Sequence, residues 1–333
     1  MLDAASDRPL VGACLIVKDE APRIEACLIA LRGLADEVVL VDTGSSDDTI
    51  AIARRLGACV VESPWRDDFA FHRNESLDLA RGWWSLVIDA DERVVSSDFA
   101  ETRRHLLDAV NGGATLPNIL LVRLALSYPD GREVPLQAPR LLRTDRRIRF
   151  TFPVHEQLDV HGEDVLLSDV VLEHTGYRDR ETLARKEQRN LRIAEAMTPG
   201  PHALHTIARA ASSLSDWPKV LGAARRLLSQ PAPRVLRREV AVHGATAAFN
   251  SGSLPTMAEM VGTLQGIDPD HLDSARMAAI YHLGRYLELA SRSGSHEDLI
   301  RPRLFHHDPA EIANASRALV AEPAAVKRSP DAP

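Results

Sequence analysis

Cysteine is scarce in this sequence of 333 residues, and no two of its three cysteines form a close pair. Cys14, Cys27 and Cys59 lie too far apart for the paired-cysteine clusters that bind structural zinc. Cys14 and Cys59 lie in apolar, strand-like runs, and Cys27 lies on the apolar face of a helical segment. All three thiols are therefore predicted to be buried and to serve packing rather than chemistry.

Aromatic residues, surplus basic charge and long apolar runs are also lacking. Aromatic residues make up 5% of the chain, so aliphatic side chains must fill the cores. The formal net charge of −7 excludes a broad, non-specific nucleic-acid surface. Apolar runs such as Ile119–Leu126 are too short for a transmembrane segment, and Met1–Pro9 lacks the apolar stretch of a secretory signal. These absences predict a cytoplasmic location.

Strand-like and helix-like segments alternate in the first part of the chain. Short, continuous apolar runs are typical of strands covered on both faces, and amphipathic segments lie between them. This alternation predicts an α/β domain with a parallel, Rossmann-like sheet and right-handed crossovers. The expected strands are Val11–Val17, Val38–Val41, Ala58–Val61 and Leu86–Ile88. The expected helices lie around Ile24–Leu31, Ile50–Leu56 and Arg73–Arg81, the second capped by Asp47.

The pattern changes from about Ile119, where short alternating segments predict an antiparallel or mixed extension of the sheet. These segments are Ile119–Leu126, Pro139–Leu142, Ile148–Phe150 and Val165–Leu172, with a turn at 129–131. After Tyr177 only helical periodicity remains, which predicts an all-α array of helical hairpins similar to tetratricopeptide (TPR) repeats. Its helices are expected at Leu183–Met197, Leu204–Leu214, Pro218–Leu228, Arg237–Asn250, Pro255–Leu264 and Ser274–Ser291. The predicted domains are 1–178 and 179–320, followed by a flexible tail at 321–333.

Two aspartates, Asp89 and Asp91, directly follow the fourth predicted strand. Ligands of open α/β sheets bind beyond the carboxyl ends of the strands. Two carboxylates at that edge suit Mg²⁺ or Mn²⁺, with positions left for water and substrate phosphates. Such an ion would bridge a diphosphate and stabilise its charge as it leaves. The alternative is a solvated acidic turn, which the place after a fourth parallel strand disfavours.

A second polar segment, Val41–Thr49, follows the second predicted strand. Asp42 at the strand tip could accept hydrogen bonds from a nucleoside base or ribose, and Gly44 permits close approach of the backbone. A tight turn with a helix cap would account for Asp47, but it would not explain an acidic residue at the strand end.

Several segments, taken in order, resemble motifs of the family 2 glycosyltransferases. They are Ile16–Glu20, Val41–Ser45, Trp65–Phe69 with Arg73–Asn74, and Asp89–Glu92. The residues within these motifs are similar to those of the SunS-like subgroup, whose members often carry a C-terminal helical repeat domain. Three later segments also match that subgroup: Pro139–Arg143, Val154–Leu158 and His174–Tyr177. The resemblance covers about residues 10–230, with Asp19 where asparagine is usual and no motif at 101–117.

The resemblance implies a GT-A fold that moves a sugar from a nucleotide-sugar, with UDP as the favoured nucleotide. The acceptor would be a peptide, a protein or a saccharide. Asp42 would contact the base, Arg73 the base or its phosphate, and Glu20 the ribose. The full set of donor-binding residues would be Val17, Glu20, Asp42, Arg73, Asp89 and Arg140. Mn²⁺ or Mg²⁺ would be held by Asp91 as the direct ligand, with Asp89 and His174.

Members of this family invert the anomeric centre, which requires a base on the acceptor side of the sugar. Glu156 is predicted to be that base and His155 a positioning or metal-side residue, although the two could exchange roles. Each histidine also fits an ordinary structural role. The donor sugar and the acceptor atom (O, S or N) stay open, and the helical domain could bind the acceptor or form a homodimer.

Other functions fit the motifs less well. Haloacid-dehalogenase-type phosphatases also place two aspartates after a strand, but they want Thr or Val at the position of Arg93. Nucleotidyltransferases need a glycine-rich phosphate loop, and none follows Val17. A catalytically weak scaffold, acting through its helical half, is the non-enzymatic alternative. The intact Asp91 and His155–Glu156 disfavour it.

Overall fold

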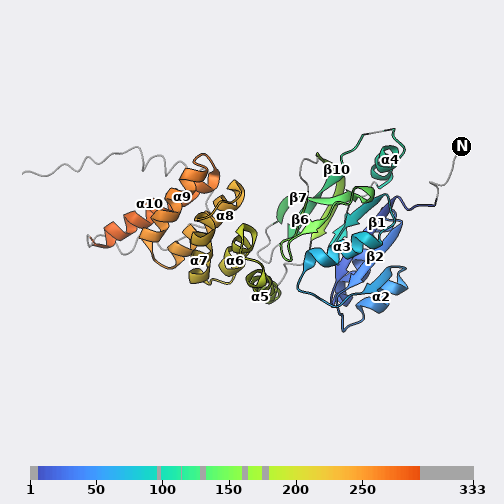
Figure 1. Ribbon diagram of the computed structural model, residues 1–333, viewed down its shortest axis with the longest axis horizontal. Coiled ribbons are helices and arrows are strands. Elements are labelled where there is room, and N and C mark those ends of the chain that lie inside the picture. The colour runs from blue at the N-terminus through green and yellow to red at the C-terminus, as the bar shows by residue number, and fades with distance from the viewer. Residues whose placement is uncertain are drawn as a thin grey trace, which may run out of the picture. The chain divides into compact units, whose positions relative to one another are not determined.

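The computed structural model describes residues 7–95, 99–113, 115–127, 133–159, 164–174 and 180–292 (Figure 1). Contacts divide the chain into two compact units, Met1–Lys186 and Glu187–Pro333. The division falls inside helix α5 (Arg180–Ala196). The turn predicted at 129–131 and the tail predicted at 321–333 lie outside the described residues.

An eight-stranded mixed sheet forms the first unit, in the order β3-β2-β1-β4-β7-β6-β10-β5. Its strands are β1 (Val11–Val17), β2 (Glu37–Asp42), β3 (Cys59–Glu62), β4 (Trp84–Val87), β5 (Glu92–Val94), β6 (Ile119–Ser127), β7 (Glu133–Arg143) and β10 (Val165–His174). β1 pairs in parallel with β2 and β4, whereas β7 runs antiparallel to β4 and β6. The predicted α/β class, with a mixed sheet, is confirmed. A two-stranded sheet joins β8 (Phe150–Thr151) to β9 (Gln157–Leu158).

Helices of the first unit pack their apolar faces against this sheet. They are α1 (Ala21–Ala30), α2 (Thr49–Arg55), α3 (Phe69–Leu79) and α4 (Phe99–Val110). Trp84 is fully buried and its Nε1 donates a hydrogen bond to the Leu106 carbonyl of α4, at 3.3 Å. The sequence analysis placed no helix at 99–110 and no strand at β5, because neither segment carries a long apolar run.

The cysteines match their predicted burial only in part. Cys14 and Cys27 are fully buried, and burial raises the pKa of the Cys14 thiol to about 12. Cys59 is exposed, so the prediction of a third buried thiol is wrong. The reason is topological: β3 ends the sheet order, and an apolar run alone does not show that a strand lies at an edge.

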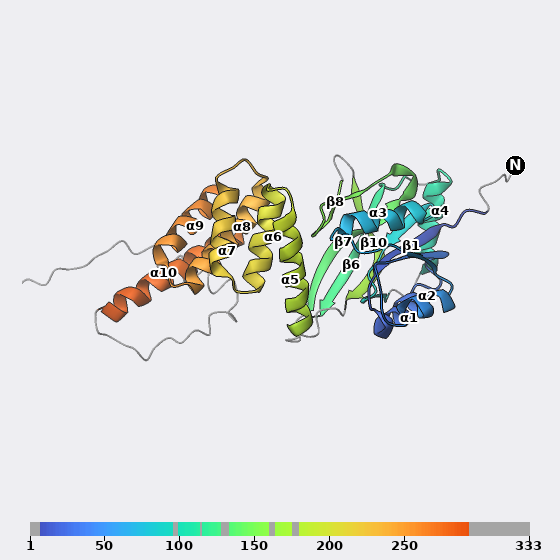
Figure 2. The same ribbon diagram turned by 60° about the horizontal axis from the view of Figure 1, so that its bottom comes forward.

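The second unit is all helical over its described residues, which end at Arg292 (Figure 2). After the end of α5, its helices are α6 (Pro201–Ser213), α7 (Trp217–Leu228), α8 (Arg234–Asn250), α9 (Leu254–Ile267) and α10 (Leu272–Arg292). Consecutive helices from α6 to α10 pack on one another, and α6 also packs on α8, as expected for stacked helical hairpins. A Cβ atom on Gly244 of α8 would come within 2.8 Å of Met260 Sδ, so glycine permits this close packing. No helix in the described ranges is both long and apolar enough to cross a membrane.

A partly buried polar cluster lies between α6 and α8. His205 Nε2 lies 2.7 Å from Glu239 Oε2, and the rings of His205 and His243 are 6.5 Å apart. Burial, followed by the nearby His205 and Arg209, lowers the pKa of His243 to about 4. His243 is therefore neutral in the folded unit at neutral pH.

Acidification should destabilise the helical unit through His243. Its pKa is lower in the folded chain (about 4) than its ordinary value of 6.5, so the stabilisation is complete above pH 6.5 and is lost as the pH falls toward 4. Between pH 7.5 and pH 5 we expect a loss of about 2 kcal/mol in the free energy of unfolding. Urea unfolding followed by circular dichroism measures it, with His243→Gln as the control. An equal pH dependence in parent and variant would show that His243 is not the group responsible.

Candidate active site

The carboxyl ends of three parallel strands meet at one edge of the sheet. β1 lies between β2 and β4, so the chain moves to one side of β1 for β2 and β3 and to the other side for β4. Ligands of doubly wound sheets bind at such a switch point. Asp42 ends β2, and Asp89 and Asp91 follow β4, so the acidic residues chosen from the sequence lie at this edge.

The loop after β2 forms hydrogen bonds with one of the two carboxylate oxygens of Asp42. The residue is 1% exposed, and its Oδ1 accepts hydrogen bonds from the Gly44 and Ser45 amides at 2.9 and 2.8 Å. Gly44 has φ 107°, a conformation that favours glycine. Asp42 Oδ2 is buried and has no hydrogen-bond partner among the described residues. A buried acceptor without a donor is costly, so this oxygen is suited to a ligand N–H.

The loop after β1 is tied to the loop after β2. Asp19 Oδ1 accepts from the Ser46 amide at 2.7 Å, so aspartate at the usual asparagine position serves as a cross-link. The amide of Glu20 donates to Thr49 Oγ1 at 2.8 Å. Asp47 accepts from the Thr49 amide at 3.0 Å, yet the N-cap of α2 is Asp48, so the predicted cap is one residue too early. These hydrogen bonds hold the loops after β1 and β2 together, and the two loops form one wall of the site.

Val17 and Glu20 lie on this wall as well. The Val17 carbonyl accepts hydrogen bonds from the amide and hydroxyl of Thr43, at 2.9 and 3.1 Å. Glu20 pairs with Arg23 at 2.8 Å, and burial raises the pKa of Glu20. Val17 therefore contributes to the shape of the loop through its backbone, whereas Glu20 presents a carboxyl group near the strand ends.

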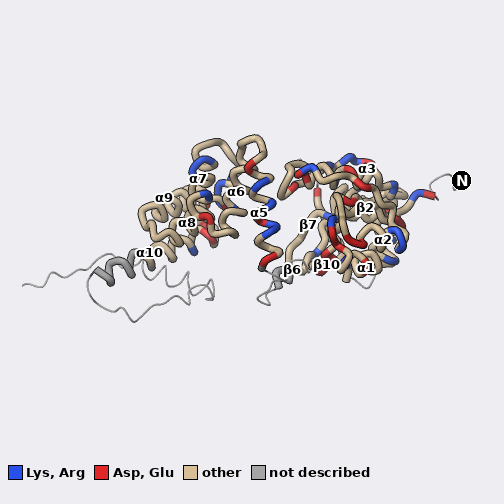
Figure 3. Tube along the Cα trace, turned by 90° about the horizontal axis from the view of Figure 1, so that it is seen from below, with Lys and Arg blue, Asp and Glu red and all other residues tan. Residues whose placement is uncertain are grey.

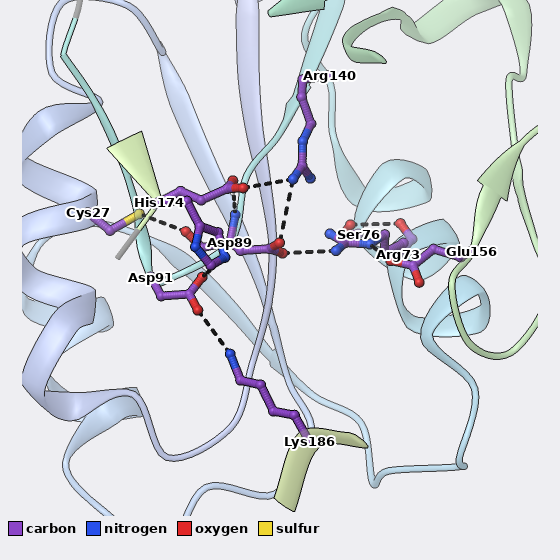
Figure 4. A network of polar contacts seen from close by, with 10 residues as sticks. Cys27, Arg73, Ser76, Asp89, Asp91, Arg140, Glu156, His174 and Lys186 are labelled. Carbon is purple, nitrogen blue, oxygen red and sulfur yellow. Dashed lines mark hydrogen bonds and ion pairs between the residues drawn. The ribbon is translucent and has the colours of Figure 1, made fainter. Parts of the chain in front are cut away.

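Arg73 of α3 links two carboxylates (Figure 4). Its Nη2 donates to Asp89 Oδ1 at 2.9 Å and its Nε to Glu156 Oε1 at 2.6 Å. Burial lowers the pKa of Arg73, but the charges of Asp89 and Glu156 outweigh burial and raise it, so the guanidinium stays charged. Its Nη1 is buried and has no hydrogen-bond partner among the described residues, which leaves a donor for an anionic ligand.

Asp89 and Glu92 share Arg140 of β7. Arg140 Nη2 lies 2.7 Å from Glu92 Oε1 and 3.7 Å from Asp89 Oδ2. Burial acts to raise the pKa of Asp89, but Arg73 and Arg140 lower it well below its usual range. Glu92 is fully buried, and burial raises its pKa to about 7 despite Arg140. Asp89 is thus fixed as an anion whose side chain points toward the two arginines.

Asp91 lies apart from this pair, beside His174 at the end of β10. His174 Nε2 is 3.6 Å from Asp91 Oδ1, and Lys186 Nζ is 3.2 Å from Asp91 Oδ2 (Figure 4). Burial lowers the pKa of His174 more than the nearby carboxylates raise it, so the imidazole is neutral at pH 7. No group of three or more potential metal ligands is assembled within the described ranges. A carboxylate with a neutral imidazole nevertheless fits Mn²⁺, if substrate phosphates complete the ligand set.

The segment that carries His155 and Glu156 is fastened to α3. Asn74 Nδ2 donates to the Phe150 carbonyl and Asn74 Oδ1 accepts from the Phe150 amide, both at 2.9 Å. His155 has φ 50° in the turn that follows β8. Glu156 is thereby brought to Arg73, 83 residues away in the sequence, and so to the aspartates.

Four predicted site residues share one network of ion pairs: Arg73, Asp89, Arg140 and Glu156. Asp91 and His174 contact each other, whereas Val17, Glu20 and Asp42 lie at and after the ends of β1 and β2. The sequence analysis did not single out Glu92 or Lys186. Glu92 belongs to the same acidic motif as the aspartates, and that position is the signal that could have identified it. Trp65, in the segment before α3, stacks on His72 with ring centroids 5.3 Å apart, so it forms part of an aromatic cluster.

Comparisons with known proteins find similarity in the region that carries Asp42, Arg73, Asp89 and Asp91. Residues 13–110 match the family model described as glycosyl transferase family 2. A TPR repeat-containing protein of Synechococcus elongatus is 36% identical over 150 residues, which are 45% of this chain and 35% of that protein. The SPbeta prophage-derived glycosyltransferase SunS of Bacillus subtilis is 24% identical over 204 residues, covering 58% of this chain and 46% of SunS. The chain thus spans less than half the length of these curated relatives.

Among solved structures, S. aureus TarS 1–349 in complex with UDP-GlcNAc aligns with a TM-score of 0.43 and 14% identity. The alignment covers 88% of this chain and 95% of that one. The resemblance to family 2 predicted from the motifs is confirmed by the match at residues 13–110.

Proposed function

We propose that this chain, whose residues 13–110 belong to glycosyl transferase family 2, transfers a sugar from a nucleotide-sugar to an acceptor. The observation that carries the proposal is a pair of unpartnered polar atoms among the residues at the switch point. Asp42 Oδ2 is a buried acceptor and Arg73 Nη1 a buried donor. A nucleoside diphosphate offers both complements, an N–H on its base and anionic oxygens on its phosphates.

Uridine suits Asp42 better than cytidine does. The N3 position of uracil is a donor, whereas the N3 position of cytosine is an acceptor that a carboxylate would repel. Because two backbone amides engage Oδ1, Oδ2 is the atom that faces the base in this proposal. UDP-sugars are therefore the proposed donors, in agreement with the family resemblance.

Mn²⁺ is the proposed ion, held by Asp91 and His174 and by the donor diphosphate. When bound, the ion offsets the negative charge that develops on the leaving diphosphate. Arg73 and Arg140 keep Asp89 ionised and hold its carboxylate toward their own side chains. We therefore infer that Asp89 contributes to donor binding mainly through its charge and through contacts with the ribose. This arrangement leaves two protein ligands, a number that fits an ion bound together with substrate phosphates.

Glu156 is proposed to accept the proton of the acceptor. Its Oε1 is engaged by Arg73, and Oε2 would take the proton as the acceptor atom bonds to the anomeric carbon. The bond from that carbon to the diphosphate breaks on the opposite face, which inverts the centre. The acceptor is proposed to be a peptide, a protein or a saccharide, and the helical unit is its proposed binding surface.

Thermal unfolding with four nucleotides tests the donor proposal. UDP, CDP, GDP and TDP are added with and without Mn²⁺ to the parent, Asp91→Asn and Asp42→Asn. UDP with Mn²⁺ should raise the melting temperature of the parent strongly and CDP should not, since a ligand at a hundredfold excess over its dissociation constant stabilises the fold by about 2.7 kcal/mol. Asp91→Asn should lose the dependence on metal.

Asp42→Asn gives the sharper result. The two backbone amides should retain the Asn oxygen, so its amide nitrogen replaces Oδ2 as a donor. Affinity for UDP should fall by about tenfold or more, because the uracil donor then faces another donor, and preference should shift toward CDP. Absence of a shift with every nucleotide in the parent would refute the donor proposal.

A further inference from the structure

Lys186 reaches into the acidic site from α5. Its Nζ lies 3.2 Å from Asp91 Oδ2, although the two residues are 95 positions apart in the chain. The Asp91 side chain is 9% exposed and the Lys186 side chain 32% exposed. Lys and Arg residues recur along α5 in Figure 3, and Figure 4 shows the Lys186 side chain extended toward Asp91. The contact is therefore made with a nearly buried carboxylate, unlike an ordinary surface pair.

Lys186 and His174 face different oxygens of the Asp91 carboxylate. His174 faces Oδ1, and the Lys186 ammonium faces Oδ2. An ion held by Asp91 and His174 would lie within a few ångströms of Nζ, because the ammonium already contacts the other oxygen of the same carboxylate. Two cations that close repel each other strongly in a partly buried site. The ammonium and the divalent ion therefore compete for the charge of one carboxylate.

We propose that Lys186 is the counter-ion of Asp91 in the metal-free protein, that Mn²⁺ displaces it, and that its ammonium then binds the diphosphate of the donor. The inference rests on the proposed function, because it presupposes an ion at Asp91 and a diphosphate on that ion. The lysine side chain suits this exchange: its four-carbon stem is flexible, and its ammonium carries three donors that bind phosphate as a point charge.

The displaced ammonium does not have far to move. The diphosphate that completes the ligand set of the ion must lie next to it, and Lys186 begins within contact distance of the same carboxylate. The exchange thus replaces one ion pair, Lys186 with Asp91, by two: Mn²⁺ with Asp91 and Lys186 with phosphate. The site would favour Mn²⁺ together with the nucleotide over Mn²⁺ alone.

The proposal predicts effects of opposite sign on two ligands. Lys186→Met should raise the affinity for Mn²⁺ alone by about tenfold. A charge at contact distance shifts the binding of a proton to a neighbouring group by about this factor or more, and we expect a similar effect on the binding of a metal ion. The same variant should lower the affinity for UDP at saturating Mn²⁺ by about tenfold. A lysine that merely stabilised α5 would not strengthen the binding of the metal.

Both affinities are measurable on the full chain without an acceptor. The signal of free Mn²⁺ in electron paramagnetic resonance reports metal binding, and isothermal titration calorimetry reports UDP binding. Arg185→Met is the matched control: it removes the same charge from the neighbouring position of α5, where Arg185 is exposed and bonds to Thr182. It should change neither affinity by more than about twofold.

Asp91→Asn separates the two proposals. Loss of Mn²⁺ binding in Asp91→Asn, with unchanged Mn²⁺ and UDP affinities in Lys186→Met, would overturn the role of Lys186 and leave the metal site standing. Mn²⁺ binding that survives Asp91→Asn would place the ion elsewhere and overturn both. A rise in Mn²⁺ affinity with a fall in UDP affinity supports the exchange.

Discussion

Replacement of Arg73 by methionine should lower the free energy of unfolding by about 3 kcal/mol at pH 7. The Arg73 side chain is 9% exposed and joins Asp89 to Glu156, so its removal leaves two carboxylates without their main partner. Breaking one side of a buried ion pair costs about 3–5 kcal/mol, and the lower figure applies because Asp89 keeps Arg140 at 3.7 Å. Methionine retains the apolar volume, so the charge is the main change.

The pH dependence of this loss has a definite sign. Arg73 lowers the pKa of Asp89 below its ordinary value of 3.8, so the stabilisation is present above that value and is lost as the pH falls. The difference between parent and Arg73→Met should therefore shrink below about pH 4. Urea unfolding followed by tryptophan fluorescence measures it, since Trp65, Trp83 and Trp84 lie in the first unit.

A double-mutant cycle supplies the control. In the variant that combines Arg73→Met with Glu156→Gln, no carboxylate at position 156 is left uncompensated. The combined loss should be smaller than the sum of the two single losses by about 1 kcal/mol or more. Strictly additive losses would show that Arg73 and Glu156 do not stabilise each other.

Turnover should fall in Arg73→Met by about 10²–10³-fold, because a charge near the diphosphate is missing.

The sequence predicted the strands well where burial on both faces leaves a continuous apolar run. Val11–Val17 is β1 residue for residue, because this strand lies inside the sheet and its side chains are buried on both faces. Cys59 shows the limit of that signal: its strand is equally apolar in local sequence, but it lies at the end of the sheet. Position in the sheet is a property of strand order, which local periodicity does not contain.

The site could be predicted where its residues follow strands, and less well where distant segments supply charges. Asp42 and Asp89 were identifiable because the carboxyl ends of parallel strands share an edge. Lys186 lies on a helix rich in charged residues, where one lysine looks like a solvated face. Only the fold shows that it meets Asp91. The pairing of Arg73 with Glu156 likewise depends on a segment 83 residues away.

Glu156→Gln should reduce turnover by about 10²–10⁴-fold while leaving the affinity for UDP nearly unchanged. Glutamine can still accept the hydrogen bond of Arg73 Nε through its amide oxygen, so the fold and the donor site should persist. It cannot take a proton from an acceptor. Turnover with water as the acceptor is measured as the hydrolysis of a UDP-sugar, which is monitored through the UDP released.

His155→Asn distinguishes the two candidate bases. His155 has φ 50°, and asparagine tolerates this left-handed conformation better than most residues do. If Glu156 is the base, His155→Asn should lose less than about tenfold in turnover, since it removes a positioning group alone. The reverse order, a small loss in Glu156→Gln and a large one in His155→Asn at equal UDP affinity, would assign the base to His155. Similar large losses in both would mean that the pair acts as a unit, with His155 orienting the carboxylate that takes the proton.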